Sequence, residues 1–243
     1  MHPLNLHYLP LPPPFFLMLV VLLAAVIAWV QFRAIEYAYA RIGIPLKYFF
    51  VLLLCSLLGS YINIPVANLP NEQVLSGQIV TFFGMQYVIP MVVNWPGTVI
   101  AVNIGGAVIP ILISLYLITK FRIYLPALLA VIVVTLVCHQ LAHPVRGVGI
   151  AEPAFVPTLI TAFTAIAISR KYAAPIAYIA GSVGTLIGAD LLNLNRVRGL
   201  GAPVASIGGA GTFDGIFITG ILAVVLAGFF TSRQSSASSR TNP

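Results

Sequence analysis

The sequence predicts an all-α membrane protein, a bundle of about seven transmembrane helices with a short β-like hairpin on its outer side. Hydrophobic residues make up 60% of the 243 residues and charged residues only 7%. A soluble domain of this length carries about a quarter charged residues. The mean hydropathy of +1.03 points the same way, so lipid has to cover most of the surface.

Seven apolar runs are long enough to be membrane spans, since a helix needs roughly 20 apolar residues to cross about 30 Å of hydrocarbon. They are Phe15–Val30, Tyr48–Ile64, Thr98–Thr119, Ile123–His139, Pro153–Ser169, Pro175–Leu192 and Asp214–Phe230. The first is interpreted as a true span rather than a signal peptide, because its basic residues follow it. Residues 1–14 then form a Pro-rich outer segment, residues 15–232 a single membrane domain, and residues 233–243 a disordered cytoplasmic tail.

The basic residues between the runs predict the orientation. Nine lie on one side of the predicted bundle: Arg33, Arg41, Lys47, Lys120, Arg122, Arg170, Lys171, Arg233 and Arg240. Only Arg146, Arg196 and Arg198 lie on the other side. By the positive-inside rule the richer side is cytoplasmic, so the N-terminus is expected outside and the C-terminus inside the cell (plasma) membrane. No basic run carries interleaved aromatic residues, so a nucleic acid partner is not expected.

Two outer segments differ from simple loops. Residues Val66–Pro96 are rich in β-forming residues and interrupted at Gly84, which favours a hairpin on the outer face. An interfacial loop with aromatic anchors is the alternative. Residues Asn193–Phe213 are glycine-rich and uncharged from Gly199 onward, which suits a chain that re-enters the membrane against protein.

Polar residues at membrane depth are the candidate functional residues, since burying them in lipid is costly. Counted from Ala174, Phe230, Ile123 and Thr119 at the cytoplasmic side, 16 residues lead to each of four polar residues: Asp190, Asp214, His139 and Asn103. At 1.5 Å per residue this places all four about 24 Å above the inner boundary. Four polar side chains on four helices at one depth predict a pocket that faces outward.

An aspartyl dyad is the first chemistry that this pocket could support. Two carboxylates that share a site cannot both ionise, so one holds a proton while the other activates water. Asp190 and Asp214 lie on consecutive predicted helices and would be the catalytic pair. Asn103, His139 and Asn193 would position substrate or water. The alternative is that each aspartate caps or bridges helices, and Asp214 is a good N-cap residue.

A metal site is the second option. His139 and His143 are spaced i, i+4, as in the zinc signature H-E-x-x-H, but Gln140 stands where that signature has its glutamate. Pro144 also disfavours a helical conformation at His143. Interfacial histidines bonded to backbone are the simpler interpretation, so no metal and no cofactor is expected. Cys55 and Cys138 lie in apolar runs and are expected to be free buried thiols.

Translocation is the third option. Gly105 and Gly106 lie on one predicted helix, and Gly181, Gly184 and Gly188 lie on another. Close helix packing explains such glycines most simply. Glycine-lined, broken helices around polar groups also form the substrate sites of secondary transporters. The expected partners are the lipid bilayer and a membrane-embedded peptide or small solute.

Three segments carry a family resemblance: PVRGVGIAEPA (144–154), GSVGTLIGADLLNL (181–194) and GAPVASIGGAGTFDGIFITGILAV (201–224). They resemble a family of uncharacterised prokaryotic multi-pass membrane proteins, the domain of unknown function 1614, which implies no activity. GTFDGIFITG is also similar to the Gly-x-Gly-Asp region of presenilin-type and signal-peptide-peptidase-type intramembrane proteases. That similarity implies a second aspartate on the preceding helix, which Asp190 would match. Phe213 stands where that motif has glycine, and no later Pro-Ala-Leu helix follows.

The sequence therefore favours an intramembrane aspartyl hydrolase that uses Asp190 and Asp214. A proton-coupled or small-solute transporter with the same pocket is the alternative. A structural or accessory membrane protein, whose aspartates only lock the helices together, is the third hypothesis.

Overall fold

The computed structural model describes residues 13–70, 72–82, 85–146, 149–153, 155–209 and 219–228. Its α-helices are α1 (Pro13–Arg41), α2 (Leu46–Gly59), α3 (Ile109–Phe121), α4 (Tyr124–Leu141), α5 (Phe155–Ile168), α6 (Ala173–Ile179) and an unlabelled helix at Thr219–Gly228. The π-helix η1 (Ile104–Val108) leads into α3. The π-helices η2 (Ala180–Gly184) and η3 (Leu186–Asp190) and the 3₁₀ helix η4 (Leu191–Val197) continue α6. Asp214 and the tail lie outside the described residues.

Four of the described helices are long and apolar enough to cross a membrane: Pro13–Arg41, Ile104–Phe121, Tyr124–Leu141 and Ala173–Val197. Three apolar helices in the described part are shorter: Phe50–Gly59, Phe155–Ile168 and Thr219–Gly228. The chain is thus compatible with a membrane protein, as its composition predicts. The count of seven spans stays a prediction.

The ends of the second and third predicted spans are strands rather than helix. Strand β1 (Asn63–Asn68) follows α2, and strand β4 (Val99–Asn103) precedes η1. β4 is the middle strand of a three-stranded sheet, antiparallel to β1 and parallel to β7 (Val204–Ile207). The apolar composition of these segments predicts helix. They are strands because each pairs with a segment that lies elsewhere in the chain. The glycine-rich segment Asn193–Phe213, which was expected to re-enter the membrane, likewise contains strand β7.

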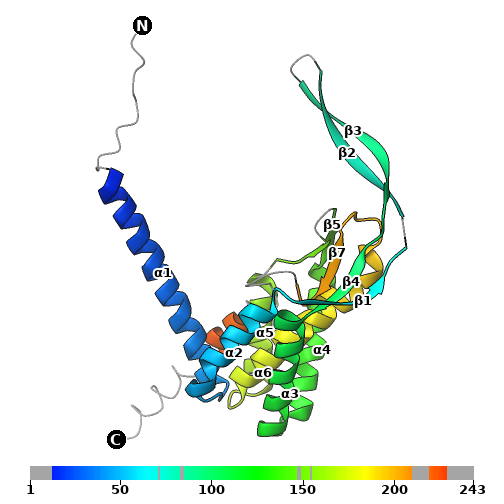
Figure 1. The fold of residues 1–243 in the computed structure, drawn as a ribbon. Helices are drawn as coiled ribbons and strands as arrows, with labels where there is room; N and C mark the ends of the chain where they lie inside the picture. The colour runs from blue at the N-terminus through cyan, green and yellow to red at the C-terminus, as the bar shows by residue number, and fades with distance from the viewer. Residues whose placement is uncertain are drawn as a thin grey trace, which may run out of the picture.

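The outer hairpin is confirmed. Strands β2 (Glu72–Phe82) and β3 (Met85–Trp95) pair antiparallel in unbroken register from Glu72↔Trp95 to Phe82↔Met85. The hairpin projects away from the helices as a two-stranded ribbon (Figure 1), so it does not lie along the outer face. A second, short hairpin joins β5 (His143–Val145) to β6 (Gly149–Ala151) between α4 and α5.

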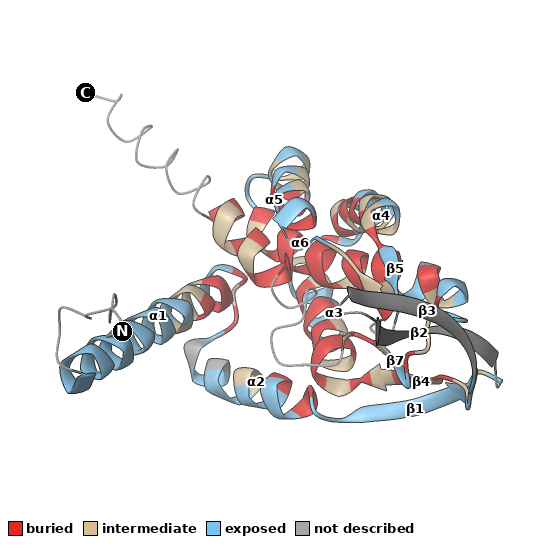
Figure 2. Cartoon of the chain, turned by 90° about the horizontal axis from the view of Figure 1, so that it is seen from above, coloured by how far each residue is buried: buried red, intermediate tan, exposed pale blue. Residues whose placement is uncertain are grey.

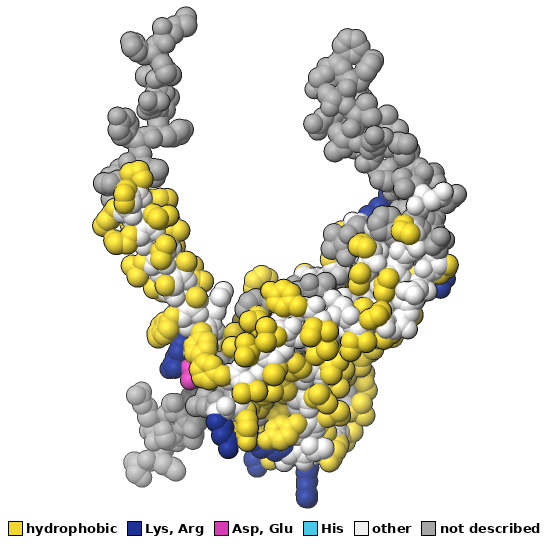
Figure 3. Space-filling view, in the orientation of Figure 1, with side chains coloured by type: hydrophobic (Ala, Val, Ile, Leu, Met, Phe, Trp, Pro, Cys, Tyr) yellow, Lys and Arg dark blue, Asp and Glu magenta, His cyan; other side chains and the backbone are white. Residues whose placement is uncertain are grey.

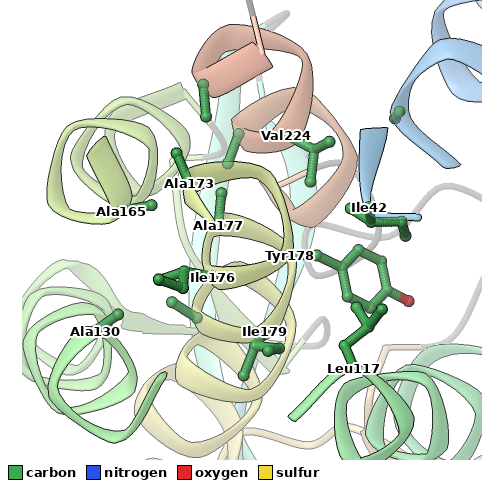
Figure 4. Packing of buried hydrophobic residues seen from close by; sticks show 14 of the residues in the cluster. Ile42, Leu117, Ala130, Ala165, Ala173, Ile176, Ala177, Tyr178, Ile179 and Val224 are labelled. Atoms are coloured by element: carbon green, nitrogen blue, oxygen red, sulfur yellow. The ribbon is translucent and has the colours of Figure 1, made fainter. Parts of the chain in front are cut away.

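Helix α6 is the centre of the bundle. Together with η2, η3 and η4 it forms the continuous helix Ala173–Val197, which is the most buried of the four long helices, at 72% compared with 0% for α1 (Figure 2). Its Ile176, Ala177 and Ile179 are almost fully buried. Around α6 lie side chains from α3, α4, α5, the end of α1 and the helix Thr219–Gly228, among them Leu117, Ala130, Ala165, Ile42 and Val224 (Figure 4). Small residues on several neighbours let the helices approach closely.

Glycines make the closest of these contacts, which supports the packing interpretation of the glycine pattern. A Cβ at Gly184 would lie 2.9 Å from Val134, and a Cβ at Gly181 would lie 2.9 Å from Gly220. A Cβ at Gly106 would collide with the carbonyl oxygen of Gly208. Backbone therefore packs directly on backbone where η1 meets the glycine-rich segment after β7.

Asn103 joins the outer sheet to η1. Its side-chain oxygen accepts a hydrogen bond from the Gly106 N–H at 2.8 Å, so it is the N-cap of the π-helix. Its amide nitrogen donates to the Ser60 carbonyl oxygen at 2.7 Å and to Asn63 Oδ1 at 3.1 Å. The residue is 1% exposed. It therefore bonds the start of one span to the end of α2 and to β1.

Helix α1 stands apart from the other helices over most of its length (Figure 1). Only Ile35, Ala38 and Tyr39, near its C-terminal end, are buried. Its remaining apolar surface is exposed along its whole length, as the yellow arm of Figure 3 shows. Lipid is the solvent that suits this surface.

Replacing Gly106 with alanine should destabilise the protein by about 1–3 kcal/mol, because its new methyl group meets a backbone carbonyl that cannot rotate away. The matched variant Gly220→Ala should be nearly neutral, because its nearest neighbour is the Ser182 hydroxyl, which can rotate. Thermal melting of both variants in detergent checks the difference. Equal melting temperatures would contradict the tight contact.

Replacing Asn103 with alanine should cost about 1–3 kcal/mol, because the change removes the cap and leaves the Gly106 N–H and the Ser60 carbonyl unpaired. Asn68→Ala on the same sheet removes an exposed side chain and should change stability by no more than about 0.5 kcal/mol. Chemical denaturation in mixed micelles compares the two. A stable Asn103→Ala protein would rule out the capping role.

Candidate functional site

Asp190 is the last residue of η3, on the central helix of the bundle. Its side-chain oxygen Oδ2 accepts a hydrogen bond from the Gly208 N–H at 2.7 Å. The residue is partly buried and has a further interaction besides this one. The carboxylate thus holds the glycine-rich segment after β7 against the outer end of the central helix. Asp214, its predicted partner, lies outside the described residues.

The positive φ of Gly208 explains why glycine stands there. Its φ is +94°, a conformation that side chains with a Cβ rarely adopt. A Cβ would also lie 2.7 Å from Ala107. The turn presents the Gly208 N–H to Asp190 and the Gly208 carbonyl to Gly106. Asp190 is therefore linked to Asn103 through two backbone segments. Asp190 bonds to Gly208, Gly208 packs on Gly106, and Gly106 bonds to Asn103.

Cys138 is the centre of a second group of polar side chains, on the neighbouring helix α4. Its sulfur lies 3.5 Å from the Thr185 hydroxyl. Glu152 and Asp190 are both close enough to act on this thiol electrostatically. Both carboxylate oxygens of Glu152 are shielded from solvent. Strand β6 packs on η3 and η4, which brings Glu152 to this place.

The sequence places Glu152 just before the predicted span Pro153–Ser169, but it does not show that this carboxyl group lies near Cys138. The signal that could have identified it is its rarity, since the chain has five acidic residues. The fold brings two of them, Glu152 and Asp190, to one thiol at the outer end of the bundle. Two carboxyl groups in a partly buried site can share or relay a proton.

Asn193 lies one turn beyond Asp190 and is fully buried. Its amide nitrogen donates to the Gly188 carbonyl at 2.8 Å and to the Ala189 carbonyl at 3.0 Å. These bonds satisfy carbonyls where the π-helix changes to a 3₁₀ helix. Within the described residues its Oδ1 atom has no hydrogen-bond partner, so this oxygen can accept a further hydrogen bond.

The two histidines do not share a helical face. Helix α4 ends at Leu141, and Ala142 is extended with ψ 127°. His143 lies on strand β5 and is exposed, because a residue before proline avoids the α conformation. His139 stays on α4, and its Nδ1 atom is buried with no hydrogen-bond partner among the described residues. The metal-site hypothesis for this pair is therefore wrong in its geometry, and no group of three or more His, Cys, Asp or Glu in the described part could hold a metal ion.

Both thiols are free, as expected. Cys138 is buried, but Cys55 on α2 is exposed on the apolar outer surface of the helix. The prediction of two buried thiols is thus right for one of them.

π-helical turns surround the candidate site. η3 ends at Asp190, η2 precedes it on the same helix, and η1 begins directly after Asn103. Short π-helical stretches are uncommon and occur frequently at functional sites, because they shift side chains out of the regular helical register. The site therefore consists of Asp190 and Asn193 on irregular helices, the Cys138 thiol on α4, and Glu152 and Asn103 at the ends of strands β6 and β4.

Comparison with known proteins identifies a family. The family profile described as "Protein of unknown function (DUF1614)" matches residues 57–226, which is more than half of the chain and includes every residue of the candidate site. The matched region begins inside α2, so α1 lies before it. No curated protein and no solved structure matches the chain. The protein belongs to the DUF1614 family.

Proposed function

We propose that this protein is a membrane-embedded hydrolase of the aspartyl type, with Asp190 and Asp214 as its acid and base. The observation that carries this proposal is the hydrogen bond between Asp190 Oδ2 and the Gly208 N–H. Gly208 precedes Asp214 by six residues in the sequence. The bond therefore ties one aspartate to the segment that leads to the other.

The chemistry follows from two carboxyl groups in one site. One carboxylate takes a proton from water, whose oxygen then attacks the carbonyl carbon of a peptide bond. The other, protonated carboxylic acid gives its proton to the amide nitrogen as the C–N bond breaks. The products are a carboxylic acid and an amine. Two carboxyl groups that share one site cannot both ionise easily, so one of them holds the proton that this step needs.

Other parts of the site suit a peptide substrate. Asn193 has a buried side-chain oxygen with no hydrogen-bond partner among the described residues, which could accept a bond from a substrate N–H. The parallel sheet of β4 and β7 lies next to the Asp190 segment. An extended peptide can pair with exposed strand edges of this kind. We propose an outward-facing site of Asp190, Asp214, Asn193 and His139 in a protein with its N-terminus outside and seven spans.

Replacing either aspartate with asparagine should lower hydrolysis at least 100-fold, because each variant removes one member of the acid–base pair. The assay follows cleavage of a fluorogenic single-span peptide reconstituted with the protein in liposomes. Glu36→Gln, at a partly exposed residue paired with Arg33, makes the equivalent change away from the site and should keep full activity. Full activity in Asp190→Asn or Asp214→Asn would refute the pair. Melting curves check that the variants are folded.

A proton-coupled transporter is the second candidate, and buried hydroxyl groups favour it. Thr161 and Thr219 are fully buried, and within the described residues their hydroxyl oxygens have no hydrogen-bond partner. Thr161 lies against Gly181, which itself contacts Gly220. The Thr185 hydroxyl group lies 3.5 Å from the Cys138 sulfur, one helical turn beyond Gly181 on the central helix. A row of hydroxyl groups that leads inward from Asp190 is suited to carry protons or a small polar solute.

This alternative predicts proton movement through the bundle. Liposomes that contain the protein and a pH-sensitive dye should dissipate an imposed pH gradient several-fold faster than protein-free liposomes. Thr161→Val should slow this flux, because it removes one hydroxyl group without changing the size of the side chain. A proton flux equal to that of protein-free liposomes would exclude proton coupling. A protein that cleaves the peptide but conducts no protons would favour the hydrolase.

A further inference from the structure

The ends of the helices opposite Asp190 carry a dense group of cations. Seven basic residues among the described ones lie near these helix ends or in the connections between them: Arg33, Arg41, Lys47, Lys120, Arg122, Arg170 and Lys171. Glu36 is the single acidic residue in the same segments, and it pairs with Arg33 at 2.6 Å. In Figure 3 the dark blue side chains lie mainly along the lower end of the bundle. We call this end the basic face.

Tertiary contacts hold the connections of the basic face together. Lys120 Nζ, at the end of α3, donates to the Gly43 carbonyl oxygen between α1 and α2 at 2.5 Å. The ring of Phe121 lies 5.7 Å from the ring of Tyr172, just before α6. These two contacts join three connections that are far apart in the sequence.

Two lysines flank the Phe121–Tyr172 ring pair. Lys120 Nζ lies 5.4 Å from the Phe121 ring centre, and Lys171 Nζ lies 5.1 Å from the Tyr172 ring centre. Arg122 follows Phe121 and is exposed. It has a φ of +53°, a conformation that a residue with a side chain rarely adopts. The fold thus brings three basic residues to one aromatic pair: Lys120 and Lys171 flank the rings, and Arg122 directly follows Phe121 in the sequence. Like charges placed close together repel one another.

We propose that Lys120, Arg122 and Lys171 bind the phosphate headgroup of an anionic phospholipid in the leaflet at the basic face. Two observations favour lipid as the source of the phosphate. The cluster lies at the ends of apolar helices, and Tyr116 and Tyr124 beside it are 47% and 59% exposed, as interfacial aromatic residues are. The positive-inside rule assigns this face to the cytoplasmic leaflet, which carries the anionic lipids. A phosphate between the cations would remove their repulsion.

The proposal is independent of the proposed function. The basic face begins where α6 starts, and Asp190 lies 17 residues beyond Ala173 on the same helix, or about 25 Å along its axis. A failure of lipid binding would therefore say nothing about hydrolysis by the aspartates, and a failure of hydrolysis would say nothing about lipid binding.

Native mass spectrometry of the full chain in an uncharged detergent tests the proposal, with phosphatidylglycerol and phosphatidylcholine as probes. We expect retained phosphatidylglycerol, a melting temperature raised by that lipid alone, and weaker binding as NaCl rises from 50 to 500 mM. Lys120→Gln combined with Lys171→Gln should weaken phosphatidylglycerol binding about 25-fold, about fivefold for each lysine. Lys120→Arg with Lys171→Arg should stay within about twofold of the wild type. Arg198→Gln, the same charge change at the other end of the bundle, should have no effect.

Equal retention of the two lipids, or unchanged binding by the double glutamine variant, would overturn the proposal. Lys120 also bonds to Gly43, so Lys171→Gln alone is the decisive variant if the double variant melts early in lipid-free detergent. Inorganic phosphate distinguishes the source of the ligand. If phosphate at millimolar concentration raises the melting temperature as much as phosphatidylglycerol does, the lipid assignment is wrong.

Discussion

Close packing of the central helix is the constraint on which the rest of the structure depends. α6 and its π-helical continuation contact α3, α4, α5 and the end of α1, and they lie against the helix Thr219–Gly228 (Figure 4). A helix surrounded in this way needs small residues, and Ala177, Gly181, Gly184 and Gly188 supply them. In lipid the hydrophobic effect does not hold helices together, so this close contact provides much of the attraction. The polar groups of the central helix are then enclosed by protein instead of lipid.

The outer end of the bundle shows what the enclosed polar groups can do. The three-stranded sheet of β1, β4 and β7 joins α2, η1 and the glycine-rich segment at one level. Asn103 bonds the sheet to η1, and Asp190 bonds the glycine-rich segment to the central helix. The backbone of these irregular segments is satisfied by sheet pairing and side chains, which membrane-embedded chains require. The same bonds leave the Asp190 carboxylate partly exposed at this end of the bundle.

The two ends of the bundle differ in charge. Asp190 lies near one end, together with Arg196 and Arg198, and seven basic residues lie toward the other end. About 25 Å of the central helix separates Asp190 from Ala173 at the start of α6. The family match covers both ends from residue 57 to residue 226, while α1 adds a largely separate apolar helix before it.

The sequence by itself determined the apolar helical class that is compatible with a membrane protein, most of the helix positions and the β2–β3 hairpin, because each depends on local composition. It also carried the family resemblance. Only the tertiary structure decided that Val99–Asn103 and Val204–Ile207 are strands, that Glu152 and Cys138 meet, that His143 leaves the helix, and that Lys120 and Lys171 flank one ring pair. These features join residues 14 to 105 positions apart, apart from the local turn at His143. A local pattern cannot encode such pairings, because each segment takes its conformation from a partner that lies elsewhere in the chain.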